Sequence, residues 1–136
     1  MNIFYILLGI SYFITSHEFA AAGEAVPLEY RNLKNPLVLT QKRRTYIAKQ
    51  YQTKCARCHG ENGEGGVKSL EALEVAPANF TDVTFMNNRT DGQLYYQIEQ
   101  GGEERSAMPA FGPDSDHGWS EKKIWEMVAY IRRLAR

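Results

Sequence analysis

The sequence has few cysteines, no excess of charge of either sign and no apolar run of membrane-spanning length, and each absence excludes a class of protein. Only two cysteines are present among 136 residues, so a scaffold held by several disulfides is excluded. Sixteen basic and sixteen acidic residues give a formal net charge of zero, so no nucleic-acid partner or acidic substrate is expected. The length fits one domain.

The most apolar stretch, residues 3–14, lies at the N-terminus and is short for a membrane span, which needs about 20 residues. Small residues follow at Ala20 and Ala22, and this spacing fits the rule for signal-peptidase cleavage. Residues 1–22 are therefore predicted to be a signal peptide, and the mature chain is predicted to begin at Gly23. No Lys or Arg precedes the apolar run, so an uncleaved membrane anchor is the alternative.

Two later segments are predicted to be irregular. Residues 23–39 contain Pro27 and Pro36 among mixed polar residues, which favours an arm over the surface. Residues 78–88 show no clear periodicity and are expected to supply apolar cover. Residues 40–136 are predicted to form the folded domain.

Three segments of the domain carry helix signals, and strand signals are weak throughout. Thr40 can cap a helix that runs to about Thr53, and Ser120 can cap the last helix. Thr90 begins a sequence with the spacing of a capping box, which predicts a helix of about ten residues. A short helix is also expected at residues 69–75. The predicted fold class is all-α.

The chemistry is concentrated in the sequence Cys55-Ala56-Arg57-Cys58-His59. Two thiols three positions apart, followed at once by an imidazole, form the C-x-x-C-H pattern of a c-type haem attachment site. The two sulfurs can form thioethers with the vinyl groups on one edge of a porphyrin, and the imidazole can bind the iron beneath the ring. One covalent haem c is therefore expected, attached by Cys55 and Cys58, with His59 as an iron ligand.

Other functions of this motif have less support. A thioredoxin-like dithiol belongs near a βαβ pattern, and none is visible. A zinc site needs two more ligands, and His117 is the one other histidine outside the N-terminal segment. A structural disulfide is the third alternative in an exported protein. The glycine-rich residues 60–66 lack the ending of a phosphate-binding loop and predict a tight loop near the haem edge.

In this order, the motifs resemble a class I cytochrome c of the bacterial periplasmic kind, over residues 45–134. The resemblance is carried by the motif at 55–60, by Gly63 and Gly65, by Ser106-Ala107-Met108-Pro109-Ala110-Phe111, and by Trp125, Val128, Tyr130, Ile131 and Arg132. It implies a cytochrome c fold of three to five helices around one haem, with the first and last helices crossing. Tyr51 and Tyr130 match aromatic positions at that crossing, whereas Ile47 replaces a residue that is usually small.

The resemblance also implies a methionine as the second axial ligand of the iron. Met108 precedes a proline in a loop just before the last helix, where the family places this ligand. Met86 and an open sixth position are alternatives. Met127 has the helical spacing of a core residue. His117 could give a bis-histidine site, but its neighbours indicate an exposed turn.

A Met/His pair would fill both axial positions, which favours electron transfer over oxygen chemistry. The chain is therefore predicted to be a periplasmic electron carrier, not an enzyme. Its donor and acceptor would be redox proteins, for example a periplasmic dehydrogenase and a terminal oxidase or reductase. The alternatives are a haem protein with an open position for a gas or peroxide, and a subunit of a larger dehydrogenase complex. The resemblance also predicts that the His59 ring donates a hydrogen bond to a carbonyl near Pro77.

Overall fold

The computed structural model describes residues 26–66, 73–102 and 106–135, and all regular structure within these ranges is helical. The elements in order are α1 (Leu28–Arg31), α2 (Gln41–Lys54), α3 (Ala56–His59), α4 (Val83–Asn87), α5 (Asp91–Gln100), α6 (Glu121–Ile131) and the short 3-10 helix η2 (Arg132–Leu134). The prediction of an all-α fold is confirmed. The predicted signal peptide lies outside the ranges described. Within them, no helix has the length and apolar character needed to cross a membrane.

The caps predicted from the sequence begin the three longest helices. The Thr40 hydroxyl accepts a hydrogen bond from the amide of Arg43 at 3.3 Å, which starts α2. Thr90 and Gln93 form both bonds of a capping box, at 3.1 and 2.8 Å, and so start α5. The Ser120 hydroxyl accepts from the amide three residues on, at the start of α6. Local side chains thus satisfy backbone donors that have no partner inside each helix.

Three short α-helices, α1, α3 and α4, were not predicted. The arm contains α1, with Pro27 at its N-cap, where its fixed φ suits the residue before a helix. The segment expected to be irregular at 78–88 contains α4, which begins where the Asp82 carboxylate accepts a hydrogen bond from the amide of Phe85 at 3.0 Å. Of the helix expected at 69–75, residues 69–72 lie outside the ranges described, and residues 73–75 are not helical.

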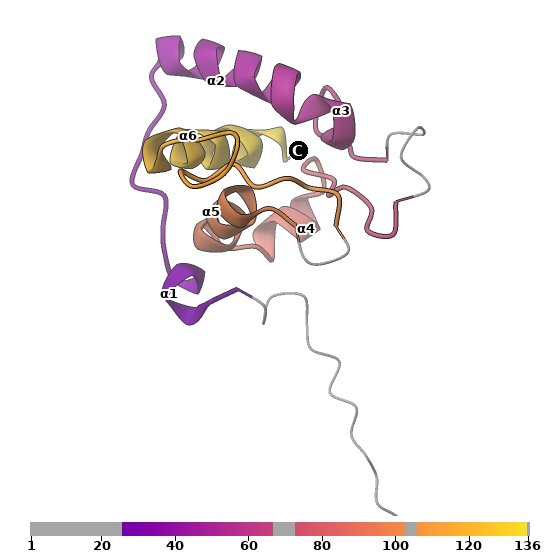
Figure 1. The fold of residues 1–136 in the computed structure, drawn as a ribbon. Helices are drawn as coiled ribbons and strands as arrows, with labels where there is room; N and C mark the ends of the chain where they lie inside the picture. The colour runs from indigo at the N-terminus through magenta and orange to yellow at the C-terminus, as the bar shows by residue number, and fades with distance from the viewer. Residues whose placement is uncertain (1–25, 67–72, 103–105, 136) are drawn as a thin grey trace, which may run out of the picture.

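Helix α6 is packed between α2 on one side and α5 on the other (Figure 1). Helices α2 and α6 are in contact, and Ile47 and Tyr51 of α2 lie fully buried in the same hydrophobic cluster as Ile124 and Val128 of α6. The rings of Tyr51 and Tyr130 lie 5.3 Å apart at an interplanar angle of 44°. The predicted aromatic contact between the first and last domain helices is therefore confirmed, with a branched aliphatic side chain beside it.

Two ion pairs fix α6 to the rest of the fold. The carboxylate of Glu126, which is 2% exposed, accepts two hydrogen bonds from the guanidinium of Arg43 on α2. Arg132, just past the end of α6, donates to the Asp91 carboxylate at 2.8 Å and to the backbone carbonyls of Met86 and Arg89. These bonds tie the end of α6 to the connection between α4 and α5, so the last helix fixes the position of both neighbours.

Candidate functional site

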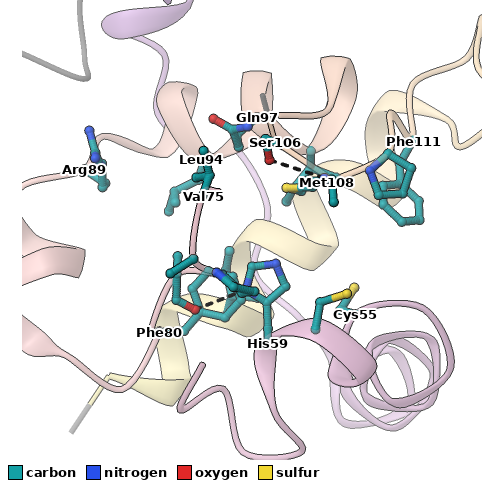
Figure 2. A pocket seen from close by; sticks show the side chains of 18 of the residues that line it. Cys55, His59, Val75, Phe80, Arg89, Leu94, Gln97, Ser106, Met108 and Phe111 are labelled. Atoms are coloured by element: carbon teal, nitrogen blue, oxygen red, sulfur yellow. Dashed lines mark hydrogen bonds between the residues drawn. The ribbon is translucent and has the colours of Figure 1, made fainter. Parts of the chain in front are cut away.

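A cavity of about 340 Å³ lies among α3, α5 and the loop that precedes α6. This volume is in the range of cofactor sites, about 300–1,000 Å³. Cys55, Cys58, His59 and Met108 all line it, so the structure brings together the four residues predicted as cofactor ligands (Figure 2). Much of the remaining wall is apolar and includes Leu73, Val75, Phe80, Leu94, Ile98, Phe111 and Ile131.

His59 ends α3 and is 9% exposed. Its Nδ1 atom lies 3.1 Å from the carbonyl oxygen of Ala78, next to Pro77, so the hydrogen bond predicted for the ring is confirmed. Because a carbonyl oxygen only accepts, Nδ1 carries the proton and Nε2 keeps its lone pair. Burial lowers the pKa of His59, although the bond to Ala78 opposes this shift, and the ring is neutral at pH 7. The ring of Phe80 stacks on the imidazole at 4.5 Å.

The glycine-rich loop after α3 brings the segment around Ala78 to the histidine. The amide of Gly65 donates to the carbonyl of His59 at 2.8 Å, and Gly65 has a φ of 63°. A Cβ atom on Gly65 would lie 2.9 Å from the carbonyl oxygen of Pro77, so the two segments could not approach with a larger residue there. The tight loop predicted from the sequence therefore positions the hydrogen-bond acceptor of the imidazole.

The two cysteines are free thiols that face the same cavity. Cys55 caps the C-terminal end of α2, and Cys58 lies one turn later in α3. Burial is the main reason that the pKa of the Cys55 thiol is raised to about 12, whereas reactive dithiols have a lowered pKa. In the part of the chain that the structure describes, no three His, Cys, Asp or Glu side chains are grouped so as to hold a metal ion. Neither the dithiol nor the zinc alternative gains support.

Met108 is positioned by the C-terminal end of α5. The amide of Gly102 donates to the Met108 carbonyl at 2.9 Å, and the amide of Phe111 donates to the carbonyl of Ile98, also at 2.9 Å. The hydroxyl of Ser106 accepts from the amide of Met108 at 3.3 Å. The loop thus occupies carbonyls that have no partner inside α5. Figure 2 shows Met108 across the cavity from His59, with open space between the two side chains.

The competing ligands from the sequence lie elsewhere. Met86 in α4 and Met127 in α6 are each 1% exposed, belong to the hydrophobic core and do not line the cavity. His117 lies in a turn, as expected, but it is half-buried because its ring stacks on Phe111 at 4.3 Å. It too is absent from the cavity wall. His17 lies outside the residues described.

Sequence reasoning did not assign most residues of the cavity wall, and Phe80, Arg89 and Val26 are three of them. Phe80 stacks on the imidazole, and Arg89 lies at the edge away from Cys55 (Figure 2). Val26 comes from the arm, far from the motif in sequence. The position of Phe80 shortly after Pro77 and the haem motif was a weak sequence signal for its place in the wall. The sequence holds no local signal for the other two, because the fold brings them to the cavity over long separations.

Residues 44–131 match a family model described as cytochrome c oxidase, cbb3-type, subunit III. The chain belongs to this family of c-type cytochromes. Among solved structures, the KustC0563 c-type cytochrome matches it with a TM-score of 0.52 and 22% identity, over 65% of this chain and 96% of that one. This likeness concerns the fold. No curated protein matches the chain.

The predicted resemblance to a c-type cytochrome is therefore confirmed, as is the cytochrome c fold. Membership of a c-type cytochrome family implies haem c as the cofactor, electron transfer as the general function, and redox proteins as the general class of partner. The arm at residues 23–39 lies outside the matched segment.

Proposed function

We propose that this c-type cytochrome carries single electrons between redox proteins through one haem c, attached by Cys55 and Cys58 and ligated by His59 and Met108. The observation that carries the proposal is that these four side chains line one cavity, with the imidazole and the thioether on facing walls (Figure 2).

The residues of the cavity suit this cofactor. The wall is largely apolar, which fits the faces of a porphyrin, and His59 offers a lone pair at Nε2. The thiols of Cys55 and Cys58 are not joined to each other. Each can add across a vinyl group, with its sulfur bonding to one carbon and its hydrogen going to the other. This addition needs no oxidant and leaves no by-product.

When bound, haem supplies a couple that gains or loses one electron. The residues of the chain set the reduction potential of this couple. The Ala78 carbonyl and the Phe80 ring hold the imidazole of His59 in one orientation. A soft thioether from Met108 and an apolar wall both disfavour the extra positive charge of the ferric state. His59 and Met108 would both hold the iron and leave no place for a substrate at the metal, so the protein would act as a carrier instead of an enzyme.

We further propose that the protein works in the periplasm. Residues 1–22 would act as the export signal, and residues 40–136 would form the domain that holds the haem. The donor would be a periplasmic dehydrogenase and the acceptor a terminal oxidase or reductase. An oxidase agrees with the name of the family, which refers to cytochrome c oxidase. Intact mass of the exported protein tests the signal: a mature chain that begins at Gly23 is expected, and retention of residues 1–22 in membranes would contradict cleavage.

The haem and its ligands are tested by spectroscopy of protein made in a host that attaches c-type haem. Colour should stay with the protein after extraction with acid acetone, and carbon monoxide should bind the reduced form slowly or not at all. Met108→Ala should abolish the weak near-infrared band of thioether-ligated ferric haem, admit carbon monoxide and lower the potential. Met86→Ala, which removes a buried methionine outside the cavity, is the matched control and should keep the band.

Three outcomes would contradict the proposal. Colour that leaves with the solvent would rule out covalent attachment. Rapid carbon monoxide binding by the unmodified protein would favour an open sixth position and ligand chemistry. Loss of the band in Met86→Ala, with the band kept in Met108→Ala, would move the second ligand to α4.

A further inference from the structure

The described part of the arm, residues 26–39, is folded onto the domain although it lies outside the segment that matches the family. Helix α1 packs against α5 (Figure 1). The hydroxyl of Tyr30 donates to the carboxylate of Glu99 at 2.9 Å. The Tyr30 ring lies 6.1 Å from the ring of Tyr95 and 4.8 Å from that of Tyr96, measured between ring centroids. One aromatic side chain of the arm therefore contacts three residues of α5.

A second anchor lies further along the arm. The amide of Asn35 donates to the carboxylate of Asp91 at 3.0 Å, and its side-chain amide donates to the carbonyl of Trp125 at 2.7 Å. The amide of Gly92 donates to the carbonyl of Leu33 at 3.2 Å. The arm thus joins the start of α5 to the middle of α6 through polar contacts.

The approach of the arm depends on one glycine of α5. A Cβ atom on Gly92 would lie 1.7 Å from the carbonyl oxygen of Tyr30 and 2.8 Å from its carbonyl carbon. These distances are far below van der Waals contact, and both atoms belong to the backbone, so no side-chain rotation could relieve them. Gly92 does not line the cavity. Its lack of a side chain serves the packing of the arm.

The start of the described arm reaches the cofactor cavity. Val26 is 7% exposed and forms part of the cavity wall together with the residues of the haem motif. Its carbonyl accepts a hydrogen bond from Nε of Arg31 at 2.6 Å, which fixes its backbone to α1. The same arm carries a second valine, Val38, which is 96% exposed and is absent from that wall.

We propose that Val26 closes part of the haem cavity to water and raises the reduction potential of the cofactor, and that the arm is held on α5 to keep Val26 in place. This inference rests on the proposed function, in which the cavity holds haem. The apolar shell of a metal site controls solvent access and the local dielectric, and both set the potential. Water admitted at this wall would stabilise the ferric charge and lower the potential.

The direct test compares two substitutions of the same type in the same arm, in protein with its haem attached. Val26→Asp should lower the reduction potential, because a carboxylate and its water would enter the cavity wall. Val38→Asp adds the same charge at an exposed position of the arm and should leave the potential unchanged. Redox titration measures both. Equal potentials in the two variants would overturn the inference, and so would a lower potential in Val38→Asp alone.

A second variant tests the arm without altering the cavity wall. Gly92→Ala should displace the arm, lower the potential in the same direction as Val26→Asp, and expose the bond after Lys34 to trypsin. This variant also serves if Val26→Asp fails to fold. Cleavage at Lys34 with an unchanged potential would show that the arm is displaced and has no effect on the haem, which would overturn the inference.

Failure of the inference is distinguishable from failure of the proposed function. Unmodified protein without covalent haem, or without the thioether band, would contradict the proposed function. Covalent haem with the band present, together with a potential that does not respond to Val26→Asp or Gly92→Ala, would contradict only the role of the arm.

Discussion

Replacement of Ile47 by alanine tests the packing of α2 against α6. Ile47 is 0% exposed, and Tyr51, Ile124 and Val128 of the same hydrophobic cluster are also 0% exposed. A change of isoleucine to alanine in a protein core costs about 2–5 kcal/mol, and the cost rises with the volume that cannot collapse. Both helices are tied in place here, because Arg43 of α2 binds the buried carboxylate of Glu126 of α6.

We therefore expect Ile47→Ala to lie in the upper part of that range, with a loss of about 3–4 kcal/mol in the free energy of unfolding. For a domain of this size the loss corresponds to a fall in Tm of about 10–15 °C. Urea unfolding of the holoprotein, followed by far-ultraviolet circular dichroism, measures the free energy. The haem should remain covalently attached to the variant protein, because the attachment motif lies outside this contact.

Two controls define the result. Ile47→Val keeps the branched shape and should cost about 0.5–1.5 kcal/mol. Lys49→Ala removes an exposed side chain from the same helix and should change stability by no more than about 0.5 kcal/mol. A loss below about 1 kcal/mol for Ile47→Ala would refute the reasoning. It would mean that α2 and α6 can move together and fill the space left by the isoleucine side chain.

Further predictions concern the end of α6 and the arm. Arg132→Ala removes the hydrogen-bond donor of the Asp91 carboxylate and of two backbone carbonyls, and it should lower the free energy of unfolding in urea by about 2–3 kcal/mol. Arg133→Ala changes an exposed neighbouring residue and should lower it by less than about 0.5 kcal/mol. The hydrogen bond to Glu99, with burial, raises the pKa of Tyr30 to about 12. Its ordinary pKa in an unfolded chain is about 10, so its contribution to stability is complete below pH 10 and is lost as pH rises toward 12. In Glu99→Gln, absorbance titration should find the pKa of Tyr30 close to its ordinary value. An unchanged pKa in that variant would contradict the assignment of the shift to Glu99.

The parts of the fold that sequence could predict depend on neighbouring residues. Thr40, Thr90 and Ser120 each bond an amide within three positions, so a cap can be recognised without knowledge of the rest of the chain. Asp82 acts in the same way at α4 and could have been found. Helix α1 has only four residues, and its packing on α5, not its own sequence, accounts for its presence.

In the candidate site, too, residues close together in sequence could be predicted and distant ones could not. Cys55, Cys58 and His59 lie within five consecutive positions, so their convergence follows from a single turn of chain. Met108 lies about fifty positions away, and only the resemblance to a family suggested it. Its approach to the cavity depends on amides of its loop that bond the last carbonyls of α5, and no pattern of residue types encodes that pairing.

Arg132 illustrates why such long-range contacts are hidden in the sequence. A cation near the end of the last predicted helix is favoured by the helix dipole, and that reason alone would account for it. In the structure its guanidinium instead bonds the Asp91 carboxylate and the carbonyl of Arg89, on either side of the cap that starts α5. The same carboxylate accepts the amide of Asn35 from the arm. Asp91 therefore joins the arm to the end of α6 at the start of the helix that carries one wall of the cavity. The family match over residues 44–131 contains Asp91 but neither Arg132 nor Asn35, so the contact that joins these three residues becomes visible only in three dimensions.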